Sequence, residues 1–157
     1  MKFRALIPLF GQKAGIPDLA LDESGGASLL FDDEHEISFT ADEADGSVLF
    51  CCALGGFEAL VRDLGAAREL LCASLLGART GGAAFAVNDE TGELVLWKRF
   101  DDDFADEEDF EGRLNAFLGQ CIAWKEKAAH LQGDDAGDGT GSGQLDSLAG
   151  LGGALMI

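Results

Sequence analysis

Two histidines, four cysteines and several acidic runs are the side chains of this sequence that could carry chemistry. His35 stands among acids and His130 closes a long helical pattern. Neither histidine lies near a nucleophile in the strained turn that nucleophilic catalysis uses. The cysteines lack C-x-x-C spacing and two of them are adjacent, a geometry that rarely serves a disulfide or a zinc site; they are Cys51, Cys52, Cys72 and Cys121. We expect reduced core thiols and no catalytic residues.

The acidic runs could bind a hard cation, but their spacing argues against it. Residues 32–36 read DDEHE, and successive side chains of a strand point to opposite faces, so few of them could converge on one ion. Residues 134–139 resemble the start of an EF-hand loop, yet Leu145 stands where the bidentate glutamate belongs. The glycines that follow come after a helical pattern and not after a strand, unlike a phosphate-binding loop. We therefore expect no metal and no cofactor.

Charge and length limit the partners. The 157 residues carry a formal net charge of −18, which would repel a phosphate backbone, so nucleic acid is excluded and a neutral or basic protein fits better. No run approaches the eighteen or so apolar residues of a membrane span, and the start has no cleavage site of small residues. We expect a protein that stays in the cytoplasm, with one domain and a tail.

Along the chain, apolar residues recur with two different spacings, the helical one and the alternation typical of strands. Apolar residues from Phe3 to Ala14 follow a helical stripe that contains Pro8 and stops at Gly15. The period then changes to two, which predicts three antiparallel strands near 27–31, 37–41 and 48–52.

The second half of the sequence predicts a helix, a hairpin and a further helix. Residues 57–76 return to helical spacing, and residues 83–100 predict a hairpin that turns between Asp89 and Gly92. The last helix starts at Asp106, a good N-cap followed by an acid at Asp109. The fold class is therefore α+β, in the order helix, three strands, helix, two strands, helix. The domain covers residues 1–131, and residues 132–157 form a flexible glycine-rich tail.

Several stretches, taken in order, resemble the class I chaperones of type III secretion, the Tir-chaperone family. The matching residues are Gly15-Ile16-Pro17 before Leu19, Leu21 and Asp22; Leu30-Phe31-Asp32-Asp33; Leu75-Leu76-Gly77 with Thr80-Gly81-Gly82; Asn88 to Gly92; Val95 and Leu96; and Phe110, Phe117 and Trp124. The resemblance spans about residues 3–130. It implies a curved antiparallel sheet flanked by helices, a bacterial cytoplasmic homodimer, and a function that uses no ATP. It also implies that the dimer binds the extended N-terminal segment of a secreted effector and keeps it soluble.

Two sets of apolar residues are candidates for these contacts. An unfolded client gains affinity by adding a strand to a sheet edge and by placing side chains in apolar pockets. For effector binding we select residues of the first helix and the first two strands, which could equally be plain core: Phe3, Leu6, Phe10, Leu29, Phe31, Ile37 and Phe39. For the dimer interface we select the broad apolar stripe of the middle helix and one strand residue: Leu60, Leu64, Leu71, Leu75 and Phe85.

Two other functions remain open at this point. A YbjN-like sensory or regulatory domain would bind some other protein through a similar sheet. An enzyme would need a deep polar cleft with perturbed ionisable groups, whereas a chaperone needs shallow apolar grooves.

Overall fold

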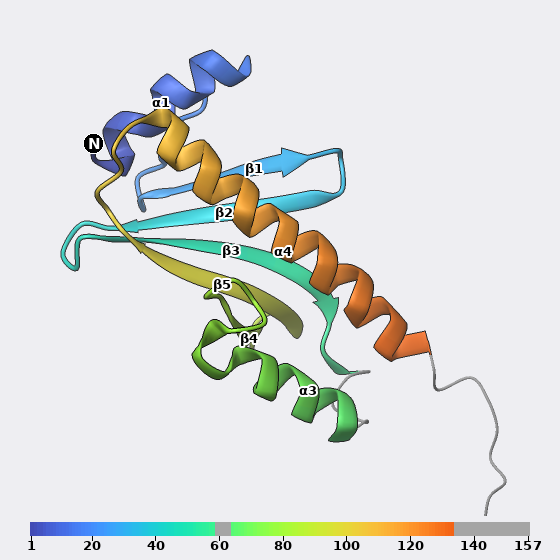
Figure 1. Cartoon of the computed structure of the whole chain (residues 1–157). Helices are drawn as coiled ribbons and strands as arrows, with labels where there is room; N and C mark the ends of the chain where they lie inside the picture. Colours follow the sequence, from blue (N-terminus) through green and yellow to red (C-terminus); the bar gives the residue numbers. More distant parts are fainter. Residues whose placement is uncertain (59–63, 134–157) are drawn as a thin grey trace, which may run out of the picture.

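A long helix lies diagonally across a five-stranded antiparallel sheet in the computed structural model, which describes residues 1–58 and 64–133 (Figure 1). The elements are α1 (Phe3–Ala14), β1 (Gly26–Phe31), β2 (His35–Asp42), β3 (Ser47–Gly56), α3 (Leu64–Ser74), the 3-10 turn η1 (Leu75–Gly77), β4 (Ala84–Asn88), β5 (Glu93–Asp101) and α4 (Glu107–Gly133). The predicted α+β class and element order are confirmed. The predicted tail lies outside the described residues from 134 onward.

The strand order is β1-β2-β3-β5-β4, so β1 and β4 form the two edges. The central pair, β3 and β5, is the longest, and its register shifts between Ala53 and Gly55. Gly55 has φ of 117°, a backbone conformation that side chains disfavour, so glycine suits this irregularity. β3 is longer than the predicted strand over 48–52. Its pairing with β5 continues past the register shift to Gly56, and the alternating sequence pattern does not show this continuation.

The first helix ends where predicted, whereas the middle helix differs from its predicted limits. α1 ends as predicted, with Gly15 in the left-handed conformation and the amide of Ile16 bonded to the Gly11 carbonyl at 2.7 Å. The predicted helix over 57–76 is described from Leu64, and its regular part stops at Ser74. Leu76 has a left-handed φ of 55°, which breaks the helical path and produces the 3-10 turn.

The core lies between one face of the sheet and the helices α1 and α4, and phenylalanine dominates it. Phe110 of α4 is fully buried, and its ring centroid lies 5.0–6.1 Å from five other rings: those of Phe3, Phe10, Phe39, Phe50 and Phe104. Edge-to-face and tilted contacts of this kind add to the free energy of apolar burial. This cluster holds the sheet against α4, so it fixes which face of the sheet is covered.

The start of α4 is fixed by the predicted cap. Asp106 Oδ1 accepts a hydrogen bond from the Asp109 amide at 2.9 Å, and Asp109 Oδ2 accepts one from the Ala105 amide at 3.1 Å. Arg113 donates to the same Asp109 carboxylate, and this bond is the main reason that the pKa of Asp109 lies below its ordinary value. The Asp109 amide, an orphan donor of the first turn, and the Ala105 amide just before the helix are thereby both satisfied.

Asp106→Ala is expected to lower the free energy of unfolding by about 1 kcal/mol, because it removes the cap. Asp106→Ser keeps an acceptor at the same place and serves as the matched control. Urea unfolding followed by circular dichroism measures both variants. Equal losses for alanine and serine would mean that the side-chain bond does not stabilise this helix end.

Within the described residues, no helix is both long enough and apolar enough to cross a membrane.

Candidate functional site

The sheet has one covered face and one open face. Along β2 and β3, buried residues such as Phe39 and Phe50 alternate with exposed or half-buried ones such as Ser38 and Cys51. α4 crosses the face that carries the buried set (Figure 1). In the part of the chain that the structure describes, the other face has no helix packed on it. It is therefore a surface that a partner could contact.

A groove of about 470 Å³ lies on this open face, at the end of the sheet where β2 begins and β3 ends. We call it the sheet groove, and its lining residues are Glu36, Ser38, Cys51, Ala53, Ala86, Val87, Asn88, Glu93, Val95 and Trp97. Trp97 lies opposite Cys51 on one side and opposite Ala84 on the other, so its half-buried indole stands over small neighbours. The groove is open to solvent and mixes apolar and polar side chains, which suits the binding of an extended peptide.

A second surface is formed by the middle helix. Leu64 is 84% exposed, Leu71 74%, Leu75 69% and Leu76 94%. The first three are spaced by seven and four residues and so share one helical face. We call these four residues the α3 leucine surface. So large a group of exposed leucines is typical of a protein interface.

An apolar pocket of about 150 Å³ adjoins the α3 leucine surface. It lies between α3 and the strands β4 and β5, and it is lined by Phe57, Ala67, Leu70, Leu71, Phe85, Ala86, Val87 and Leu94. Leu70 and Leu94 are buried, whereas Leu71 and Val87 form the exposed rim. The α3 leucine surface thus continues into a hollow that another side chain could fill.

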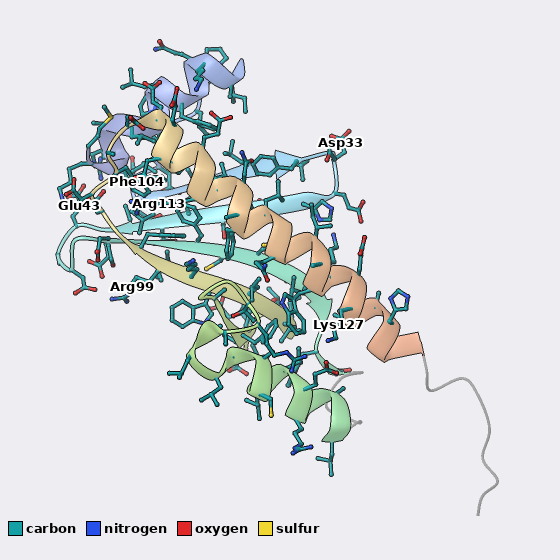
Figure 2. All side chains as sticks on the ribbon, in the orientation of Figure 1. Asp33, Glu43, Arg99, Phe104, Arg113 and Lys127 are labelled. Atoms are coloured by element: carbon teal, nitrogen blue, oxygen red, sulfur yellow. The ribbon has the colours of Figure 1, made fainter. Side chains whose placement is uncertain are left out.

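Ion pairs connect α3 to the end of α4. Glu69 of α3 accepts from Lys127 at 2.5 Å and from Arg79 at 3.1 Å, and the hydrogen bond from Lys127 is the main reason that the pKa of Glu69 lies below its ordinary value. Figure 2 shows Lys127 near the end of α4, on the side that faces α3. Beneath it, the Trp124 ring meets the Phe85 ring edge to face at 4.9 Å. These contacts give α3 a fixed position beside the sheet.

The residues selected for effector binding are mostly core in this protomer. Six of the seven have at most 8% of their surface exposed: Phe3, Leu6, Phe10, Leu29, Ile37 and Phe39. Their side chains lie in the core between the sheet and the helices α1 and α4. A side chain without exposed surface offers nothing to a ligand unless the core repacks. Only Phe31, at the end of edge strand β1, is half-buried. Direct effector contact therefore stays a prediction that the protomer favours for Phe31 alone.

The residues selected for the dimer interface are placed differently. Leu64 and Leu71 of α3 and Leu75 at the start of η1 are all exposed, while Phe85 lies half-buried against Trp124. Leu60 lies outside the described residues. The interface itself stays a prediction, but the three leucines share one surface as the helical spacing requires.

The histidine, cysteine and acidic side chains are the groups considered for metal binding and for nucleophilic chemistry. Between residues 1 and 58 and between 64 and 133, no group of three or more histidine, cysteine or acidic side chains could hold a metal ion. All four cysteines are free. Cys52 and Cys121 are buried together in the core, where their mutual hydrogen bond and burial raise the pKa of the Cys121 thiol far above its ordinary value. A protonated, buried thiol is a poor nucleophile.

The sequence prediction missed the sheet groove, although β5 carried a signal. Residues 94–97 read LVLW, so both faces of this strand are apolar. Leu94 and Leu96 are buried, whereas Val95 and Trp97 are half-buried on the open face. An exposed face with such residues indicates a binding surface, but the strand alone does not tell which face the helices cover.

One family model matches most of the chain, and several solved structures share its fold. The model of the Tir chaperone protein (CesT) family matches residues 5–125. Among solved structures, the ExsC-ExsE complex has a chain that is 25% identical, with a TM-score of 0.69 over 80% of this chain and 96% of that chain.

Two further solved structures share the fold. The HopA1-SchA chaperone-effector complex has a chain at 15% identity, with a TM-score of 0.67 over 79% of this chain and 93% of that one. The heterodimeric ExoU-SpcU complex of the Pseudomonas aeruginosa type III secretion system has one at 23% identity, with a TM-score of 0.58 over 80% of this chain and 97% of that one. No curated protein sequence matches the chain.

Proposed function

Because the chain belongs to the Tir chaperone protein (CesT) family, we propose that it is a type III secretion chaperone that binds the N-terminal segment of an effector. The observation that carries this function is the family match over residues 5–125, together with a similar fold in a chain of the ExsC-ExsE complex. The same match favours a secretion chaperone over a YbjN-like regulatory domain. The effector segment is held extended and soluble for export.

The chaperone acts by binding alone. We propose that it works in the bacterial cytoplasm, where its client is made, without ATP and without enzymatic activity. Shallow surfaces and a family of chaperones support this view. The free energy comes from apolar contact, since ordering a client segment costs a few kcal/mol and each Å² of buried apolar surface returns about 25 cal/mol. Several hundred Å² of apolar contact therefore offset the cost.

Client binding has two structural supports in the protomer. The edge strands β1 and β4 each pair on one side only, so an extended segment could add a strand to either. The sheet groove offers apolar side chains next to β4, including Val95 and Trp97. Phe31 lies at the end of β1, where an added strand would meet it.

We also propose that the working form is a homodimer joined through the α3 leucine surface. An exposed apolar helix face beside a pocket favours a symmetric contact with a second copy, in which each leucine contributes twice. The net negative charge of the chain does not prevent this dimer, because α3 and the turn after it carry both positive and negative side chains, namely Arg68, Glu69 and Arg79.

Co-expression with the proteins encoded next to this chain tests the function. We expect that one neighbour's first hundred or so residues, enough to bury the 1,000–3,000 Å² typical of coupled folding and binding, will purify with the chaperone. The remainder of the same neighbour, expressed without those residues, is the matched control and should not. If every neighbour's N-terminal fragment stays unbound while the chaperone itself is folded, the effector-binding function is refuted.

A further inference from the structure

The sheet groove has an acidic rim around an apolar floor. Its floor is formed by Cys51, Ala53, Val95 and Trp97. Glu36 of β2 is exposed on one side and Glu93 of β5 is half-buried on the other. Within the described residues, neither carboxylate forms an ion pair. Both charges are therefore available to a partner.

The register places these two carboxylates on opposite sides of β3. Glu36 precedes Ile37, the partner of Cys52, so it lies beside Ala53 on the open face. Ala53 pairs in turn with Val95, and Glu93 is the next residue along β5 on that face. Because neighbouring strands are about 4.8 Å apart, two strand spacings put the carboxylates roughly 10–12 Å from each other. An extended segment covers the same distance in about three residues.

We propose that the sheet groove binds a basic-apolar stretch of the client, in which two lysines or arginines about three residues apart flank small apolar side chains. This inference rests on the proposed function and specifies which chemistry the client presents at this surface. The apolar residues lie on the floor, and each cation meets Glu36 or Glu93. The half-buried indole of Trp97 adds an aromatic face that attracts a cation.

Charge argues against the two occupants that the chain itself could supply. A second copy placed face to face would bring two Glu36 and two Glu93 carboxylates into one contact, and like charges repel there. Residues 134–157 contain four aspartates and no lysine, arginine or histidine, so this segment also carries the wrong sign. A basic partner removes the repulsion that both of these would create.

A set of synthetic peptides tests the proposal on the full chain. The probe is a labelled ten-residue peptide with two lysines three positions apart, with valine and alanine between them and neutral residues elsewhere. Matched peptides carry glutamine or glutamate in place of both lysines. Fluorescence anisotropy at low salt is expected to show about five-fold tighter binding of the lysine peptide than of the glutamine peptide, since two partly exposed ion pairs contribute on this scale. The glutamate peptide should bind more weakly than both.

Two double variants identify where the preference arises. Glu36→Gln with Glu93→Gln should abolish the lysine preference and leave the affinity for the glutamine peptide unchanged. Glu23→Gln with Glu126→Gln removes the same charge at exposed positions outside the groove and should keep the preference. Raising the salt from about 50 to 500 mM should weaken the preference, because exposed charges are screened.

Three results would overturn the proposal. One is equal affinity for the lysine and glutamine peptides, and another is the same loss in both double variants, which would indicate a general effect of net charge. The third concerns access to Trp97, measured by acrylamide quenching in a Trp124→Phe background. A Trp97 that is already shielded in the free chain would mean that a second copy or residues 134–157 occupy the groove. In all three cases, co-purification of an effector fragment would still support the chaperone function, so the two proposals fail separately.

Discussion

Leu64→Asp together with Leu71→Asp is expected to convert the proposed dimer into monomers. Leu64 and Leu71 are 84% and 74% exposed in the protomer, so their replacement removes little from its own core. Exposed positions away from caps and buried networks usually change the free energy of unfolding by no more than about 0.5 kcal/mol. The double variant should therefore remain folded.

The expected effect on association is much larger. A leucine side chain contributes about 1.5–3 kcal/mol when it is fully buried, and a two-fold interface contains each leucine twice. Losing four such contacts removes at least about 6 kcal/mol, which raises the dimer dissociation constant roughly ten-thousand-fold. The four added carboxylates repel each other and increase the loss. Sedimentation velocity at micromolar concentration measures the change.

A matched variant separates this effect from added charge. Leu9→Asp with Leu30→Asp makes the same chemical change at two exposed leucines of α1 and β1, away from the α3 leucine surface. This control should keep the mass of a dimer. An unchanged dimer mass in the Leu64 and Leu71 double variant would reject the α3 leucine surface as the interface.

The local pattern of the sequence predicted the elements well, because each has its own signal. The Asp106 cap predicted the start of α4, and the strict alternation from Ile37 to Ala41 predicted β2. The helical spacing predicted an apolar stripe with Leu64, Leu71 and Leu75, and all three side chains are exposed, on α3 and at the start of η1. In these cases the information lies within a few residues of the chain.

The client surface was harder to predict, because burial depends on contacts between distant segments. The alternation in β2 shows that Ile37 and Phe39 share one face, but it does not tell whether a helix or a client covers that face. The contact between Phe39 and Phe110 shows that α4 covers this face, and Phe110 lies 71 positions further along the chain. Because α4 covers that face, Trp97 lies on the opposite, uncovered face of the sheet. The sequence alone indicates only that β5 has apolar side chains on both faces.

Phe39→Ala and Trp97→Ala are expected to have opposite effects on stability and on client binding. Phe39 is 1% exposed, and its ring centroid lies 5.6 Å from that of Phe3 and 4.8 Å from that of Phe50. Removing it leaves a cavity under α4, so the free energy of unfolding should fall by about 3–5 kcal/mol. Trp97 is half-buried on the open face, and its removal should cost at most about 1 kcal/mol, as for most surface changes.

Binding of the purified effector fragment should show the reverse order. Trp97→Ala should weaken binding at least ten-fold, because aromatic anchors in the middle of an interface typically contribute more than 1.4 kcal/mol. Phe39→Ala, measured at a temperature where circular dichroism shows it folded, should bind with nearly the affinity of the unchanged chain. If Phe39→Ala instead loses the client while its urea midpoint stays unchanged, Phe39 contacts the client directly. The core must then open during binding, because a side chain with 1% of its surface exposed has no other way to reach a partner.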